Sequence, residues 1–146
     1  MERINLTIDE TMFKLYRDSY LNASKAIIAT DPNFNNYLFL KEKLDELIWV
    51  SDAINYPVKI LSGLEQGENA YAVRYADENK LTKILFPVNR DEGKLAEKFR
   101  YDDMLTIATH LIVFTDGKSE DLNYLIKHAR EKQIPIYSFQ YTKNHE

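Results

Sequence analysis

The chain contains no cysteine, and glycine and proline are scarce, at four residues each among 146. The absence of cysteine excludes disulfide bonds, thiolate nucleophiles and cysteine-ligated zinc. The three histidines, His110, His128 and His145, do not cluster in the sequence. We therefore expect neither a metal site nor a bound cofactor.

Long apolar runs and an excess of positive charge are also missing. No segment approaches the about 20 consecutive apolar residues that span a bilayer, and residues 1–5 lack the apolar core of a signal peptide. We expect a cytoplasmic protein with no membrane partner. The formal net charge is −4, and the lysines and arginines are mixed with acidic residues. This pattern is typical of solvated helix surfaces and disfavours binding to nucleic acid.

Short β-rich runs alternate with amphipathic segments over most of the chain, of which 45% is hydrophobic. Strands are predicted over residues 26–30, 58–61, 82–86, 111–115 and 135–139, and helices over residues 36–50, 68–79, 95–109 and 119–133. This alternation predicts an α/β fold, a three-layer Rossmann-like sandwich with a mainly parallel sheet of about five strands.

Two of the predicted helices carry more detailed signals. In the helix over residues 36–50, helical spacing predicts one buried stripe, made of Leu38, Leu40, Leu44, Leu47 and Ile48. In the last helix, Ser119 is a plausible N-cap, and Glu120 and Asp121 follow it where the helix dipole favours anions.

Residues 1–22 are predicted to form an N-terminal extension to a domain over residues 23–146. Residues 4–8 alternate like a half-buried strand, and residues 9–20 have the apolar spacing of a short helix. Two roles are open for this extension: it could complete the sheet or cover the functional site.

The glycines mark the loops in which a ligand is expected. Gly63 and Gly117 come just after predicted strands, and Gly67 lies in the loop before a helix. Glycine lets backbone N–H groups face an anion at the positive end of a helix. The alternative is that these glycines only make tight turns.

Three blocks resemble the SLOG group of Rossmann-like domains, which includes the Lonely-guy phosphoribohydrolases and DprA, and they look closest to its YspA-like branch. The first block is residues 62–70 followed by residues 74–76, and the second runs from Gly93 to Met104. The third is residues 108–119, which end in Asp-Gly-Lys-Ser. Where the branch has Gly-Ser-Arg after its first strand, this chain has Thr30-Asp31-Pro32.

The resemblance implies a ligand site made of residues from several loops, and Arg100 falls on the arginine position of the family. The implied ligand-binding residues are Thr30, Asp31, Gly63, Gly67, Glu68, Asn69, Pro87, Arg100, Met104, Asp116, Gly117, Lys118 and Ser119. The guanidinium of Arg100 would grip a phosphate. The alternatives are an intrahelical ion pair of Arg100 with Asp102 or Asp103 and a purely capping role for Ser119.

The resemblance implies a protein that binds a nucleotide or a nucleotide-derived molecule, for instance an NAD-derived or cyclic nucleotide signal, and senses or sequesters it. The glutamate that the Lonely-guy enzymes use has no match here, because an apolar residue near Leu122 takes its place. This argues for binding without turnover. The alternatives are hydrolysis of an N-glycosidic bond and DprA-like binding of single-stranded DNA. Related domains commonly self-associate, so we expect a homo-oligomer.

Overall fold

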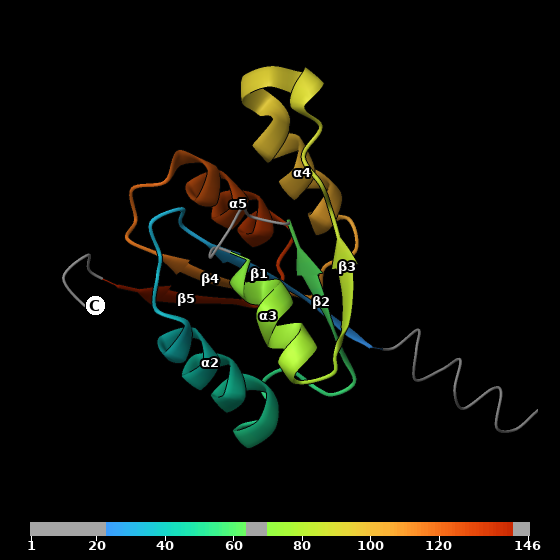
Figure 1. Ribbon diagram of the computed structural model, residues 1–146. Coiled ribbons are helices and arrows are strands. Elements are labelled where there is room, and N and C mark those ends of the chain that lie inside the picture. The colour runs from blue at the N-terminus through green and yellow to red at the C-terminus, as the bar shows by residue number, and fades with distance from the viewer. Residues whose placement is uncertain (1–22, 64–69, 142–146) are drawn as a thin grey trace, which may run out of the picture.

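The computed structural model describes residues 23–63 and 70–141 (Figure 1). The strand and helix predicted within residues 1–22 lie outside the described residues. None of the described helices is both long enough and apolar enough to span a bilayer.

The centre of the fold is a five-stranded sheet in the order β3-β2-β1-β4-β5, in which every neighbouring pair is parallel. The strands are β1 (Ser24–Thr30), β2 (Val58–Ser62), β3 (Thr82–Leu85), β4 (His110–Thr115) and β5 (Ile136–Gln140). All five predicted strands are therefore confirmed, with ends that differ by at most two residues. The fold is the Rossmann-like α/β sandwich that the sequence predicts.

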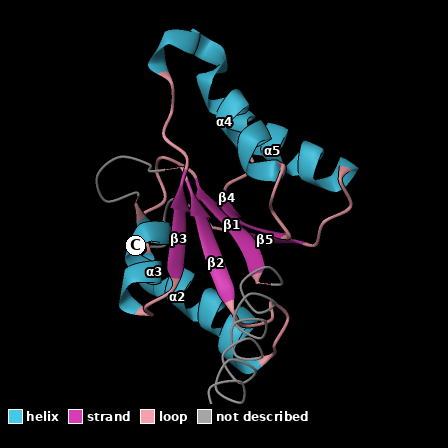
Figure 2. Cartoon of the chain, turned by 90° about the vertical axis from the view of Figure 1, so that its right-hand side faces the viewer, coloured by secondary structure: helices cyan, strands magenta, loops and turns pink. Residues whose placement is uncertain are grey.

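Helices cover both faces of the sheet, as Figures 1 and 2 show. The helices are α2 (Tyr37–Asp45), continued by the π-helical turn η1 (Glu46–Val50), α3 (Tyr71–Glu78), α4 (Ala96–Leu105), preceded by the 3₁₀ segment η3 (Arg90–Leu95), and α5 (Glu120–Glu131). α2 and α3 pack on one face, and α4 and α5 pack on the other.

Successive side chains of β1 point to opposite faces of the sheet, and the core is accordingly divided into two clusters. Ala26 and Ile28 belong to the cluster beneath α2 and α3, whereas Ile27 and Ala29 belong to the cluster beneath α4 and α5. Successive side chains of a strand point to opposite faces, so a central parallel strand must be apolar at every position. Burial of each large aliphatic side chain stabilises the fold by roughly 1.5–3 kcal/mol. The buried strands are therefore continuous apolar runs, which can be recognised in the sequence.

The first predicted helix is confirmed over nearly its whole extent, and the prediction was wrong for Leu38. Leu38 is 76% exposed, because it lies two residues before Leu40 and therefore on the opposite side of the helix. The buried stripe is formed by Tyr37, Leu40 and Leu44 and continues with Leu47 and Ile48. The regular α-helix ends at Asp45, and the chain continues to Val50 as a π-helical turn. The wider turn leaves the last two of its residues exposed.

Candidate functional site

The connection order of the sheet places a topological switch point between β1 and β4. From β1 the chain builds β2 and β3 on one side, and then crosses to build β4 and β5 on the other. Loops diverge at such a point, and ligands of open α/β sheets bind in the resulting crevice. Thr30 pairs with Phe114 at this end of the sheet, and the Asp31 N–H donates to the Phe114 carbonyl at 3.1 Å.

Asp31 is the central carboxyl group of this edge, and the residue is only 3% exposed. Its Oδ2 accepts hydrogen bonds from the Asp116 N–H at 2.7 Å and from the Tyr141 hydroxyl at 3.1 Å. The Thr115 hydroxyl lies 3.5 Å from Oδ1. Asp31 thus ties together the ends of β1, β4 and β5.

Burial raises the pKa of Asp31, and the nearby Asp116 carboxylate raises it further. Hydrogen bonds from the Asp116 N–H and from the Tyr141 hydroxyl oppose this effect by stabilising the charged form. The pKa of Tyr141 is raised by its own burial and by the charge of Asp31. The pair is therefore a protonated tyrosine that donates to a carboxylate in a poorly solvated position.

The loop from Asp116 to Ser119 satisfies several of its own backbone donors. The Gly117 N–H donates to the Thr115 hydroxyl at 2.9 Å, and the Lys118 N–H donates to Asp116 Oδ1 at 2.9 Å. Gly117 has a φ of 87°, a conformation that residues with a side chain rarely adopt. These N–H groups therefore face protein oxygens and not an open anion site.

Ser119 caps α5, as predicted. Its hydroxyl accepts a hydrogen bond from the Leu122 N–H at 3.2 Å. The first turn of α5 carries Glu120 and Asp121, which already complement the positive end of the helix. Glu120 is exposed and bonds to Lys98 at 2.9 Å, which lowers the pKa of this carboxyl group.

Thr30 differs from its neighbours because its buried hydroxyl has no hydrogen-bond partner among the described residues. By the alternation of β1, its side chain lies on the same face as those of Ala26 and Ile28. A buried hydroxyl without a partner costs about 1–3 kcal/mol. Such a group beside a switch point can bind a polar atom of a ligand at little further desolvation cost.

Arg100 is buried on α4 beside the end of β2. Its Nη1 donates to the Gly63 carbonyl at 2.6 Å, and its Nη2 lies 2.5 Å from Glu97 Oε2. Among the described residues, Glu97 forms the ion pair with Arg100, whereas the sequence had suggested Asp102 or Asp103.

The other predicted residues are spread more widely. Met104 is buried in the cluster beneath α4 and α5, where it fills core volume. Pro87 is exposed in the segment after β3, and Lys118 is exposed in the loop before α5. The remaining three, Gly67, Glu68 and Asn69, lie outside the described residues.

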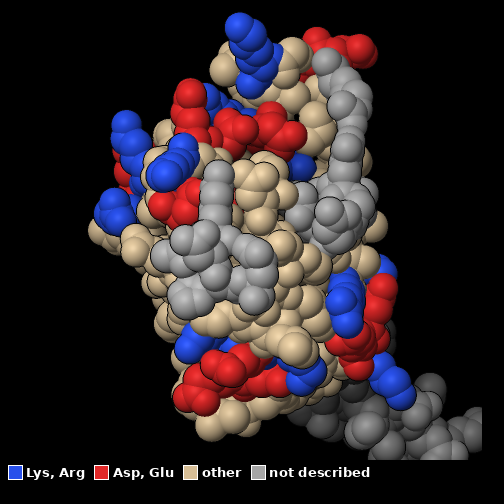
Figure 3. Space-filling view, turned by 60° about the vertical axis from the view of Figure 1, so that its left-hand side comes forward, with Lys and Arg blue, Asp and Glu red and all other residues tan. Residues whose placement is uncertain are grey.

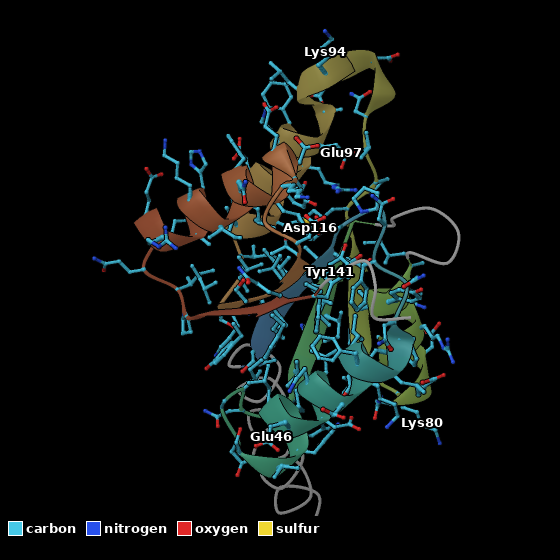
Figure 4. The ribbon with its side chains drawn as sticks, turned by 90° about the vertical axis from the view of Figure 1, so that its left-hand side faces the viewer. Glu46, Lys80, Lys94, Glu97, Asp116 and Tyr141 are labelled. Carbon is cyan, nitrogen blue, oxygen red and sulfur yellow. The ribbon has the colours of Figure 1, made fainter. Side chains whose placement is uncertain are left out.

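The sequence did not point to Tyr141, Thr115 or Glu97. Tyr141 and Thr115 lie at the carboxyl ends of predicted strands, and this position was the available signal, since parallel strands end at one edge. Figure 4 shows Tyr141 and Asp116 at the carboxyl edge of the sheet, Glu97 on α4 beyond this edge, and Glu46 at the opposite end of the molecule.

The chemistry of the edge is mixed. The carboxylates of Asp31 and Asp116 suit hydroxyl donors, and the guanidinium of Arg100 suits an oxyanion. Among the described residues, no group of three or more His, Asp or Glu side chains is arranged to hold a metal ion.

Comparisons with protein-family models, with curated proteins and with solved structures gave no significant match. The fold and the side chains at the carboxyl edge of the sheet are therefore the features that bear on function.

Proposed function

We propose that this protein binds a nucleotide-derived small molecule at the carboxyl edge of its sheet and senses or sequesters it without turnover. The observation that carries the proposal is the convergence of Asp31, Asp116 and Tyr141 at the switch point between β1 and β4. Open parallel sheets bind their ligands at this place. The resemblance to SLOG domains adds the expectation of a nucleotide.

The side chains beside β4 differ in charge from those beside β2, and this difference orients the ligand. Beside β4, two carboxylates and internally bonded N–H groups favour sugar hydroxyls over a phosphate. Beside β2, Arg100 supplies a guanidinium next to Gly63. α3 begins at Tyr71 after Ala70, a residue whose side chain cannot accept a hydrogen bond, and the positive end of a helix suits an anion. The phosphate is therefore assigned to the β2 side and the ribose to the β4 side.

Calorimetry with adenosine, AMP, ADP-ribose and NAD tests this function. We expect saturable binding of at least one phosphorylated compound, weakened by Arg100→Ala and by Asp116→Asn. The matched controls are Arg130→Ala at the end of α5 and Glu46→Gln at the opposite end of the molecule, both at exposed residues. Mass spectrometry of small molecules released from the purified, denatured protein extends the search to ligands other than these four compounds. The absence of any bound or binding nucleotide would refute the proposal.

The surroundings of two carboxyl groups, Glu120 and Asp31, support binding without turnover. Glu120 is engaged by Lys98 and has a lowered pKa, so it is a poor general base. Asp31 is enclosed by Tyr141 and by the Asp116 backbone. Chromatography of the same nucleotides after incubation should return them unchanged, whereas release of free base would favour the alternative, an N-glycosidic hydrolase.

The surface charge gives no support to DNA binding. On the face shown in Figure 3, the described lysines and arginines are interspersed with aspartates and glutamates. Nucleic-acid backbones bind to continuous basic surfaces, and such binding weakens steeply with salt. A gel shift with single-stranded DNA at low salt provides the corresponding test.

A further inference from the structure

An exposed aromatic patch lies at the end of the molecule away from the proposed ligand edge. It consists of Trp49, Val50 and Tyr56, which are 44%, 68% and 64% exposed. The rings of Trp49 and Tyr56 pack at 5.5 Å between centroids. Large apolar side chains that adjoin one another on a surface mark a place where something binds.

The patch is rigidly held. The Trp49 indole N–H donates to the Tyr75 hydroxyl at 3.0 Å, and this hydroxyl donates to Asp45 at 2.8 Å. Tyr75 lies on α3 and is fully buried in the core cluster beneath α2 and α3. A fixed aromatic surface loses little conformational entropy on binding, so it is suited to a permanent partner.

The chain itself enters the fold beside this patch. The Ser24 N–H donates to the Pro57 carbonyl at 2.9 Å, and the Ser24 hydroxyl donates to the Asn55 carbonyl at 2.8 Å. Residue 23 is therefore next to the segment that carries Tyr56. Figure 2 shows this end of β2 on the side of the sheet opposite to η3.

The 22 residues that precede this entry point supply a fitting occupant. They include apolar residues at alternating and helical spacings, namely Ile4, Leu6, Ile8, Met12, Phe13, Leu15, Tyr16 and Tyr20. Even as a helix, 22 residues would extend about 33 Å, far more than is needed to reach a patch that begins beside residue 23. A tethered segment also binds at a high effective concentration.

We propose that residues 1–22 dock in cis on the Trp49–Val50–Tyr56 patch. The N-terminal segment then covers the amino end of the sheet and leaves the carboxyl edge open to ligand. Of the two roles that the sequence leaves open, this excludes cover of the functional site.

Trp49 is the only tryptophan, so its fluorescence reports directly on the patch in the full chain. We expect several-fold weaker acrylamide quenching in the wild type than in the double variant Phe13→Asp/Tyr16→Asp. The matched control, Thr11→Asp/Ser19→Asp, adds the same charge at polar positions and should quench like the wild type. Far-UV circular dichroism checks that each variant is folded. Equal quenching in all three proteins would overturn the proposal.

A spin label separates docking in cis from docking on a second copy. The chain has no cysteine, so Thr11→Cys gives one nitroxide site, and the single Trp49 indole N–H gives one NMR signal. We expect this signal to broaden when label and ¹⁵N are in the same molecule. In a mixture of labelled ¹⁴N protein and unlabelled ¹⁵N protein it should stay sharp. Broadening in the mixture would show an exchanged segment and overturn docking in cis.

Discussion

The guanidinium of Arg100 occupies the space that a side chain on Gly63 would need, and its Nη1 donates to the Gly63 carbonyl at 2.6 Å. A Cβ at position 63 would overlap the guanidinium carbon and two of its nitrogens. The glycine therefore permits the helix α4 to be joined to the end of β2 through one buried, charged hydrogen bond.

Gly63→Ala should destabilise the protein by roughly 1–3 kcal/mol, the usual cost of an extra methyl group in a filled interior. The added Cβ displaces Arg100 from both the Gly63 carbonyl and Glu97. Urea denaturation followed by circular dichroism measures the change in the free energy of unfolding.

A double-mutant cycle controls for other effects of the alanine. In an Arg100→Ala background the clash is absent, so Gly63→Ala should cost much less than in the wild type. Equal costs in the two backgrounds would mean that the glycine is required for a reason other than the guanidinium.

The strands were predictable because they are central and parallel. β1 is buried on both faces, so Ala26 to Ala29 form a continuous apolar run that can be recognised from the local sequence. The cap at Ser119 was predictable for a similar reason, because the hydroxyl and the Leu122 N–H are only three residues apart.

The details of the site were less predictable because they depend on how distant segments meet. Nothing near Arg100 in the sequence indicates that its partner is the carbonyl of Gly63, 37 residues away. Tyr141 and Asp31 are 110 residues apart and meet only because β5 ends beside β4. Leu38 illustrates a local failure, since residues two apart on a helix face opposite sides, so Leu38 cannot share the buried face of Leu40.

The buried carboxyl of Asp31 should make stability depend on pH in a definite direction. Its pKa in the folded state lies above the ordinary value of 3.8, so the folded state holds the proton more tightly than the unfolded state. The contribution of Asp31 to the free energy of unfolding is therefore fully present below pH 3.8, and it is lost as the pH rises through the raised pKa. Urea denaturation of wild type and Asp31→Asn between pH 4 and pH 7 measures this loss, because asparagine does not titrate.

We expect the stability of Asp31→Asn relative to the wild type to increase with pH across this window. All other groups titrate alike in both proteins, so the difference between their free energies of unfolding reports the titration of residue 31 alone. A difference that is constant with pH would show that the folded state does not perturb this carboxyl group.

Tyr141→Phe should raise the pKa of Asp31 further. The Tyr141 hydroxyl donates to the charged carboxylate at 3.1 Å and opposes the effect of burial, so its removal favours the protonated form. A pH titration of the Asp31 carboxyl carbon by NMR measures the shift. Tyr137→Phe is the matched control, since Tyr137 lies on β5 and pairs with Ile112, away from the carboxyl edge. An unchanged pKa in Tyr141→Phe would contradict the assigned role of this hydroxyl.

Ser119 offers a way to separate helix capping from ligand binding. Ser119→Ala removes the acceptor for the Leu122 N–H and should destabilise the protein by about 1 kcal/mol. Ser119→Asp keeps an acceptor at this position, so its free energy of unfolding in urea should stay close to that of the wild type. If the phosphate lies on the β2 side, as proposed, the added negative charge should leave AMP affinity nearly unchanged in calorimetry. A large loss of affinity in Ser119→Asp would instead place the phosphate at the start of α5 and reverse the proposed orientation of the ligand.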